Sequence, residues 1–235
     1  METNVEKIYR EARRKREKDR NKNRIFSQIL SVFIKSLLAG IIIAISCTAY
    51  LSVTSKYLGS AIFSVGFIVI FSYGLSLFTA RVCYFTVEDV SKRLLLIPIW
   101  LGNFMGAFLS GQILKATRFA AKFDVRAGEL CKDNLKDNIL GVLLLSFFCG
   151  ILMFIISDSF KSVKDNFQKY LIVIAATMAF ILCGFEHSIS NVFYFSVTGM
   201  ISLKSILYLG IMTLGNALGG LLIPLGHKLI ELLRK

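Results

Sequence analysis

An apolar run near the end of the chain is interrupted by residues that can do chemistry, in the stretch Cys183-Gly-Phe-Glu-His-Ser-Ile-Ser-Asn191. Ionisable residues inside a membrane segment are costly, and by default they mark a functional site. His187 can relay a proton or donate a hydrogen bond, whereas Glu186 is either an orienting acceptor or a structural group at a helix end. Asn191 is expected to satisfy backbone groups that a break in the helix sets free.

A second apolar run has a similar interruption, in Ser72-Tyr-Gly-Leu-Ser-Leu-Phe-Thr-Ala-Arg81, which contains Gly74, two serines, Thr79 and Arg81. Backbone that leaves the helix at membrane depth is tolerated only where it is buried in protein or lines a wet cavity. Paired interruptions at corresponding positions of two halves indicate a transport site.

The elements that must position these residues are membrane helices. The chain has 235 residues, 55% hydrophobic side chains, a mean hydropathy of +0.64 and two prolines, which together exclude an ordinary soluble domain. A span needs about 20 apolar residues to cross a hydrocarbon layer of roughly 30 Å. Six regions qualify: 27–51, 61–86, 94–114, 138–157, 170–199 and 205–226.

Both halves of the chain end on the same short pattern. Gly102-Asn-Phe-Met-Gly-Ala107 lies in the third span and Gly215-Asn-Ala-Leu-Gly-Gly220 in the sixth. Glycines four residues apart allow two helices to pack closely, but they do not account for the repeated Asn103 and Asn216. We therefore predict an all-α membrane protein of six transmembrane helices in two inverted three-helix repeats, with the second and fifth spans broken.

Basic residues in the flanks set the orientation, because Lys and Arg are retained in the cytoplasm. Residues 1–24 hold ten of them, and the loops 87–93 and 158–169 and the C-terminal tail hold more, so both termini are predicted to be cytoplasmic. The 115–137 connection is expected outside, where its lysines and arginines would attract anions. The predicted organisation is a basic cytoplasmic segment at 1–26, a six-span channel domain at 27–228 and a cytoplasmic tail at 229–235. The basic segment is read as a solvated or membrane-surface helix, and neither as a cleaved signal peptide nor as a nucleic-acid binder.

These motifs resemble those of the formate/nitrite transporter family, which includes formate, nitrite and hydrosulfide channels. The resemblance rests on Leu77-Phe78-Thr79, on Gly184-Phe-Glu-His-Ser-Ile-Ser-Asn191 and on the two GNxxG helices, and it covers the chain after about residue 27. It implies an aquaporin-like protomer within a homopentamer, in which each protomer has its own pore for small monovalent anions.

The resemblance also implies roles for individual residues. His187 is similar to the family's central pore histidine, and Thr79 to the loop threonine that faces it. The expected constriction residues are Leu77, Phe78, Phe180, Phe63 and Phe67. The expected supporting residues are Glu186, Asn191, Asn103 and Asn216. Lys132 and Lys136 are expected to supply positive charge to a vestibule. For Phe63 and Phe67, simple packing is the alternative.

Two positions depart from the family pattern. Asn134 stands where the family usually has a lysine, so that Lys132 or Lys136 would have to replace it, or the pore has a different charge pattern. Cys149-Gly150 stands where the family tends to have an asparagine facing the histidine.

The predicted function is a channel for small monovalent weak-acid anions, with formate favoured over nitrite and hydrosulfide, in which protonation near the central histidine aids permeation. The alternative is a proton-coupled secondary transporter of short monocarboxylates. His227 is the only other histidine, and no nucleophile, base and orienting group occur in recognisable spacing, so we expect no enzyme activity, metal site or cofactor. The expected location is the inner membrane of a bacterium.

Overall fold

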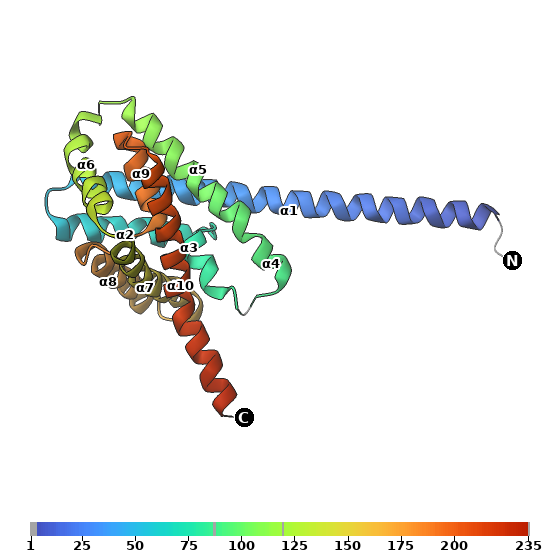
Figure 1. Cartoon of the computed structure of the whole chain (residues 1–235). Helices are drawn as coiled ribbons and strands as arrows, with labels where there is room; N and C mark the ends of the chain where they lie inside the picture. Colours follow the sequence, from blue (N-terminus) through green and yellow to red (C-terminus); the bar gives the residue numbers. More distant parts are fainter. Residues whose placement is uncertain (1–3, 87, 119, 235) are drawn as a thin grey trace.

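The computed structural model describes residues 4–86, 88–118 and 120–234, and within these ranges it contains helices and no strand (Figure 1). The helices are α1 Asn4–Ser52, α2 Lys56–Ser72, α3 Phe78–Arg81, the 3-10 helix η1 Val82–Tyr84, α4 Val90–Leu94, α5 Leu96–Lys115, α6 Ala120–Lys136, α7 Ile139–Ser162, α8 Asn166–Leu182, α9 Ser188–Thr198 and α10 Leu203–Leu233.

Four stretches of the described chain are helical, long and apolar enough to cross a membrane: Lys22–Ser52, Val90–Lys115, Ile139–Ser162 and Leu203–Leu233. Two more helices, α2 and α8, are apolar but have only 17 residues each. At 1.5 Å per residue such a helix is about 25 Å long, less than the roughly 30 Å of a hydrocarbon layer. In both cases a short non-helical segment and a further helix follow at once.

Helix α1 is longer than the predicted first span. It runs from Asn4 to Ser52 without a break at residue 26, and its first half projects far from the rest of the molecule (Figure 1). Residues 1–3 of the predicted basic segment lie outside the described residues. The C-terminal end of α10 also extends beyond the helical body.

The body is built from helix pairs that contain the GNxxG patterns. Helix α5 packs along α1, α10 packs along α7, and α2 packs against α8. A Cβ atom at Gly106 or Gly219 would collide with backbone atoms of Leu37 or Phe147 on the partner helix. Backbones therefore meet at these glycines, as expected for small residues at a helix interface in lipid.

The 115–137 connection contains a helix, α6, that the sequence analysis did not predict. Arg126 fixes this helix to the end of α1: its guanidinium donates to the backbone carbonyls of Tyr50, at 3.1 Å, and Val53, and its Cζ lies 4.5 Å from the centre of the Tyr50 ring. Near the C-terminal end of the helix, Lys204 Nζ donates to the carbonyl of Leu135 at 2.6 Å. Helix α6 is thus held in its first half and at its C-terminal end.

Candidate functional site

Two interruptions of the helices form the centre of the candidate site. Helix α2 ends at Ser72 and α3 begins at Phe78, while α8 ends at Leu182 and α9 begins at Ser188. Each interruption contains a glycine with positive φ, Gly74 at 61° and Gly184 at 68°. Only glycine adopts this left-handed conformation without strain, so the two glycines allow the chain to turn out of one helix and into the next.

Asn103 and Asn216 hold the two interruptions by the same set of hydrogen bonds. Asn103 Oδ1 accepts from the N–H of Phe78 at 2.7 Å, and its Nδ2 donates to the carbonyls of Ser36 and Ser76. Asn216 Oδ1 accepts from the N–H of Ser188 at 2.9 Å, and its Nδ2 donates to the carbonyls of Ser146 and Glu186. Backbone groups left free by the interruptions are therefore satisfied inside the protein.

The partners of these asparagines are related by a constant shift in residue number. They form three pairs whose numbers each differ by 110: Ser36 and Ser146, Ser76 and Glu186, and Phe78 and Ser188. Gly40 and Gly150 have the same shift, and a Cβ at either would collide with the backbone carbonyl of Asn103 or Asn216, respectively. Gly150 therefore lies against α10, where an asparagine side chain would not fit.

His187 joins the two interruptions. Its Nε2 lies 2.9 Å from Oγ1 of Thr79, and its side chain is 2% exposed. Its Nδ1 accepts from the backbone N–H of Ser190 at 3.3 Å and lies 2.8 Å from the Ser190 hydroxyl, so the imidazole caps the start of α9. Because Nδ1 accepts, the neutral ring carries its proton on Nε2, and Nε2 donates to Thr79.

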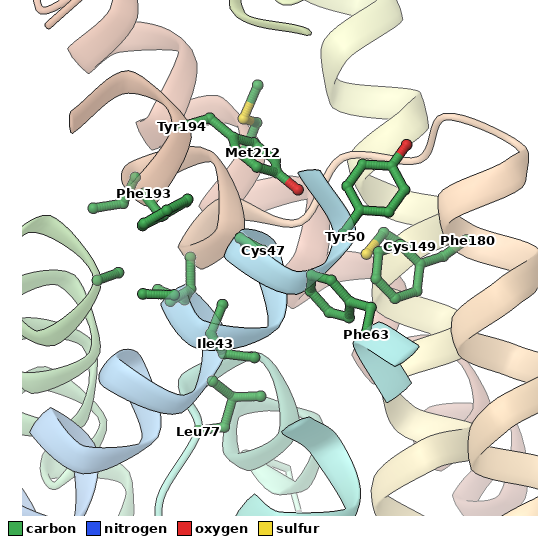
Figure 2. Close-up of a cluster of buried hydrophobic side chains, with 14 of the residues drawn as sticks. Ile43, Cys47, Tyr50, Phe63, Leu77, Cys149, Phe180, Phe193, Tyr194 and Met212 are labelled. Atoms are coloured by element: carbon green, nitrogen blue, oxygen red, sulfur yellow. The ribbon is translucent and has the colours of Figure 1, made fainter. Parts of the chain in front are cut away.

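Aromatic rings pack around the histidine. The ring centres of Phe63 and Phe180 are 5.8 Å apart, those of Phe67 and Phe180 are 6.1 Å apart, and Phe67 lies 5.9 Å from the imidazole in an edge-to-face arrangement. Figure 2 shows Phe63 of α2 beside Phe180 of α8, with Tyr50 of α1 next to them. Phe63, Phe67 and Phe180, three of the four predicted phenylalanines, thus come together as one apolar wall.

Phe78 does not join this wall. Its side chain packs in a separate cluster with Val82, Leu96 and Ile99, and only its backbone N–H serves the interruption. Leu77, its neighbour, is 1% exposed and belongs to the main apolar core.

A small cavity of about 70 Å³ opens on one side of the histidine, and we call it the Glu186 vestibule. It is lined by Tyr50, Phe63, Leu130, Asn134, Phe180, Ile181, Gly184, Phe185, Glu186, His187, Ser190, Asn191 and Tyr194. Asn134 Nδ2 donates to Asn191 Oδ1 at 2.6 Å, and Asn191 Nδ2 donates to Glu186 Oε2 at 2.7 Å. Asn191 Nδ2 also donates to the carbonyl of His187, at 3.2 Å.

Helix α6 covers this vestibule with Leu130 and Asn134. Lys132 and Lys136 lie on the same helix, but both side chains are exposed and neither lines the cavity. Burial raises the pKa of the nearby Cys131 thiol to about 12, so that this cysteine remains a neutral, buried side chain.

A larger cavity of about 420 Å³ lies at the other interruption, and we call it the Arg81 vestibule. Its lining residues are Val32, Lys35, Phe71, Gly74, Leu75, Ser76, Leu77, Ala80, Arg81, Tyr84, Ser157, Phe160 and Lys161. Arg81 is recognisable in the sequence as part of the interruption, whereas Lys35 and Lys161 are not, because nothing in their spacing relates them to it.

Comparisons with known proteins agree with this architecture. A sequence model of the family described as Formate/nitrite transporter matches residues 4–228. Formate channel FocB of Escherichia coli strain K12 is 25% identical over 188 residues, which are 70% of this chain and 65% of that protein. The chain therefore matches somewhat less than two thirds of this relative's length.

Two solved structures share the fold. A structure described as a pentameric formate channel with formate bound has a TM-score of 0.77 and 24% identity, covering 88% of this chain and 98% of that one. A structure described as an FNT family ion channel has a TM-score of 0.74 and 19% identity, covering 86% of this chain and 90% of that one. All three relatives are described as channels, in agreement with the expectation that the protein is not an enzyme.

Proposed function

The chain belongs to the formate/nitrite transporter family, and we propose that it forms a transmembrane channel for small monovalent anions of weak acids, with formate as the preferred substrate. The contact between Thr79 and His187 carries this proposal, because it joins the two interruptions, and residues of each interruption line one of the two vestibules. His187 lines the Glu186 vestibule, and Leu77, two residues before Thr79, lines the Arg81 vestibule.

Six crossings of the membrane account for the helices. In this topology α1, α7 and α10 each cross alone, α4 and α5 cross together, and the pairs α2–η1 and α8–α9 form the two broken spans, in two inverted repeats. Both termini are cytoplasmic, in the inner membrane of a bacterium, and residues 27–228 form the channel domain. The Arg81 vestibule then faces the cytoplasm and the Glu186 vestibule faces outward.

The energetics favour passage of the neutral acid. Moving a bare carboxylate into a low-dielectric constriction has an idealised cost of order 20 kcal/mol. Protonating a carboxylate with a pKa of about 4 at pH 7 costs roughly 4 kcal/mol. In the proposed mechanism, Leu77, Phe63, Phe67 and Phe180 strip water from the substrate, and His187 supplies or relays a proton or a hydrogen bond within that apolar section.

We also propose a homopentamer. Ile97, Leu101, Met105, Leu109 and Ile113 recur at every fourth position of α5, and all are exposed. Such an apolar stripe is covered by lipid or by neighbouring protomers. Native mass spectrometry of the purified protein would give the subunit number, and any stable number other than five would contradict this assembly.

Uptake of radiolabelled formate into proteoliposomes tests the proposed function. We expect uptake that increases as the external pH falls, and loss of this pH profile in His187→Asn and His187→Phe. An unchanged profile in folded variants would refute the role of His187. Unitary currents far above carrier turnover would distinguish a channel from an alternating-access transporter.

A further inference from the structure

The two vestibules are structural counterparts of one another. Eight residues that line the Arg81 vestibule have a counterpart 110 positions later that lines the Glu186 vestibule: Phe71 and Ile181, Gly74 and Gly184, Leu75 and Phe185, Ser76 and Glu186, Leu77 and His187, Ala80 and Ser190, Arg81 and Asn191, and Tyr84 and Tyr194. A ninth pair has the same shift in the opposite direction, because Phe160 lines the Arg81 vestibule and Tyr50, 110 positions earlier, lines the Glu186 vestibule. The two vestibules are therefore lined by corresponding segments of the backbone, and their charges can be compared position by position.

The charges of the two vestibules are opposite. Three cations line the Arg81 vestibule, namely Lys35, Arg81 and Lys161, and no acidic residue of the described chain lines it. Glu186 is the one charged residue among the described residues that line the other vestibule. Two counterpart pairs account for much of the contrast. Ser76 of the Arg81 vestibule corresponds to Glu186, and Arg81 corresponds to Asn191 of the Glu186 vestibule.

Neighbouring groups keep the cations at the Arg81 vestibule. Lys161 Nζ lies 3.1 Å from the centre of the Tyr84 ring, in a cation–π arrangement. Arg81 Nη2 lies 3.8 Å from Glu88 Oε1, a long and partly exposed ion pair that offsets only part of the local charge. Asp158 accepts from the Tyr84 hydroxyl at 3.3 Å. The carboxylates of Glu88 and Asp158 near the Arg81 vestibule are thus fewer than its three cations.

The Glu186 carboxylate has amide partners instead of a cation. It accepts from Asn191, which in turn accepts from Asn134. An amide chain of this kind orients the carboxyl group and brings no cation into the cavity, so the lining of this vestibule offers an anion no opposite charge.

From this contrast we propose that the channel has unequal affinities at its two ends, binding small monovalent anions more tightly at the Arg81 vestibule than at the Glu186 vestibule. The inference rests on the proposed function and adds to it the side from which substrate is captured. Focusing by a charged cleft raises the local concentration of a counter-ion by about 10-fold or more. We therefore expect the KM for formate entering at the Arg81 vestibule to be about 10-fold lower than for entry at the Glu186 vestibule.

A passive channel cannot accumulate substrate through such an asymmetry. With no voltage and equal pH on both sides, the ratio of Vmax to KM must be equal in the two directions. Entry at the Arg81 vestibule must therefore also saturate at a lower rate, by the same factor, and this coupled change distinguishes the proposal from unequal leak or damage.

Zero-trans formate influx into right-side-out and inside-out membrane vesicles tests the inference. We expect the lower KM in inside-out vesicles, in which the Arg81 vestibule faces the medium. We expect the difference to shrink at high ionic strength, because salt screens exposed charges. Equal KM values in the two orientations, with formate flux present, would overturn the inference and leave the proposed function standing. Absence of formate flux in both orientations would overturn both.

Charge-removing variants locate the effect. Lys35→Gln, Arg81→Gln and Lys161→Gln should each raise the KM in inside-out vesicles and leave the KM in right-side-out vesicles unchanged. Lys92→Gln and Lys164→Gln are matched controls, because both lysines are exposed and line neither vestibule. In the opposite direction, Asn134→Lys would place a cation beside Glu186 and should lower the KM in right-side-out vesicles. A control that shifted the KM as much as the vestibule variants would refute the assignment to this cavity.

Discussion

Thr79 and His187 are 108 residues apart in the chain, yet Oγ1 of the threonine and Nε2 of the histidine are separated by 2.9 Å. The contact forms because each residue lies beside an interruption, one between α2 and α3 and the other between α8 and α9. Each interruption is tied to a different GNxxG helix by an asparagine. The relative position of the hydroxyl and the imidazole is therefore set by the two interruptions and by the two GNxxG helices, α5 and α10, that hold them.

Removal of the Thr79 hydroxyl should weaken formate transport without unfolding the protein. Thr79→Val keeps the shape but leaves His187 Nε2 without its acceptor, and a hydrogen bond of this kind has a net worth of about 0.5–1.5 kcal/mol. We expect uptake by proteoliposomes to fall about 2- to 12-fold. Thr79→Ser retains the hydroxyl and should restore transport; equal loss in both variants would point to a packing role instead.

Asn103 and Asn216 should be essential for stability. Each bonds three backbone groups, two of which belong to an interruption, and a buried group left without a partner costs about 1–3 kcal/mol. Asn103→Ala and Asn216→Ala should therefore lower the melting temperature in detergent by a similar, large amount. A melting curve like that of the wild type for either variant would contradict this account of the interruptions.

Gly150→Ala should separate α7 from α10. The added Cβ would meet the backbone carbonyl of Asn216, which cannot move aside as a flexible side chain can. We expect a lower melting temperature together with impaired transport, because the shift would displace Asn216 and the interruption it holds. Gly210→Ala, on the exposed face of α10 with no atom near its Cβ, is the control and should be neutral or slightly stabilising.

Phe180 should set the size limit of the proposed pore. Phe180→Ala removes the ring that contacts both Phe63 and Phe67, so lactate uptake should rise relative to formate uptake. Phe167→Ala, at the exposed start of α8, should leave the ratio unchanged. The ratio of the two initial rates in the same proteoliposome preparation is the measurement, and an unaltered ratio in Phe180→Ala would place the constriction elsewhere.

The repeated GNxxG pattern and the polar interruptions could be recognised in the sequence because their chemistry is unusual in a membrane. Helix α6 was missed because its charged residues hid a helical period. Its buried residues Ala127, Cys131 and Asn134 recur at spacings of four and three, which is typical of one helix face.

Contacts between segments that lie far apart in the chain could not be predicted from the spacing of residues. The hydrogen bond from Asn134 to Asn191 spans 57 positions, and Lys35 and Lys161 meet Arg81 only through the packing of three helices. Phe78 illustrates the opposite difficulty: it follows Leu77 directly, yet the first turn of α3 directs the two side chains into different clusters. Motifs identify such residues, but only the tertiary packing assigns their neighbours.

Because the two halves of the pore are related by a shift of 110 positions, residues can be exchanged between them at corresponding positions. For each of the eight pairs, a residue from one vestibule can be placed at the corresponding position of the other, as Arg81 at position 191. Exchanging the members of these pairs would yield a variant in which the charges at these positions of the two vestibules are reversed. Copying the residues of one vestibule into the other would yield a variant with two vestibules alike at these positions, on the same backbone.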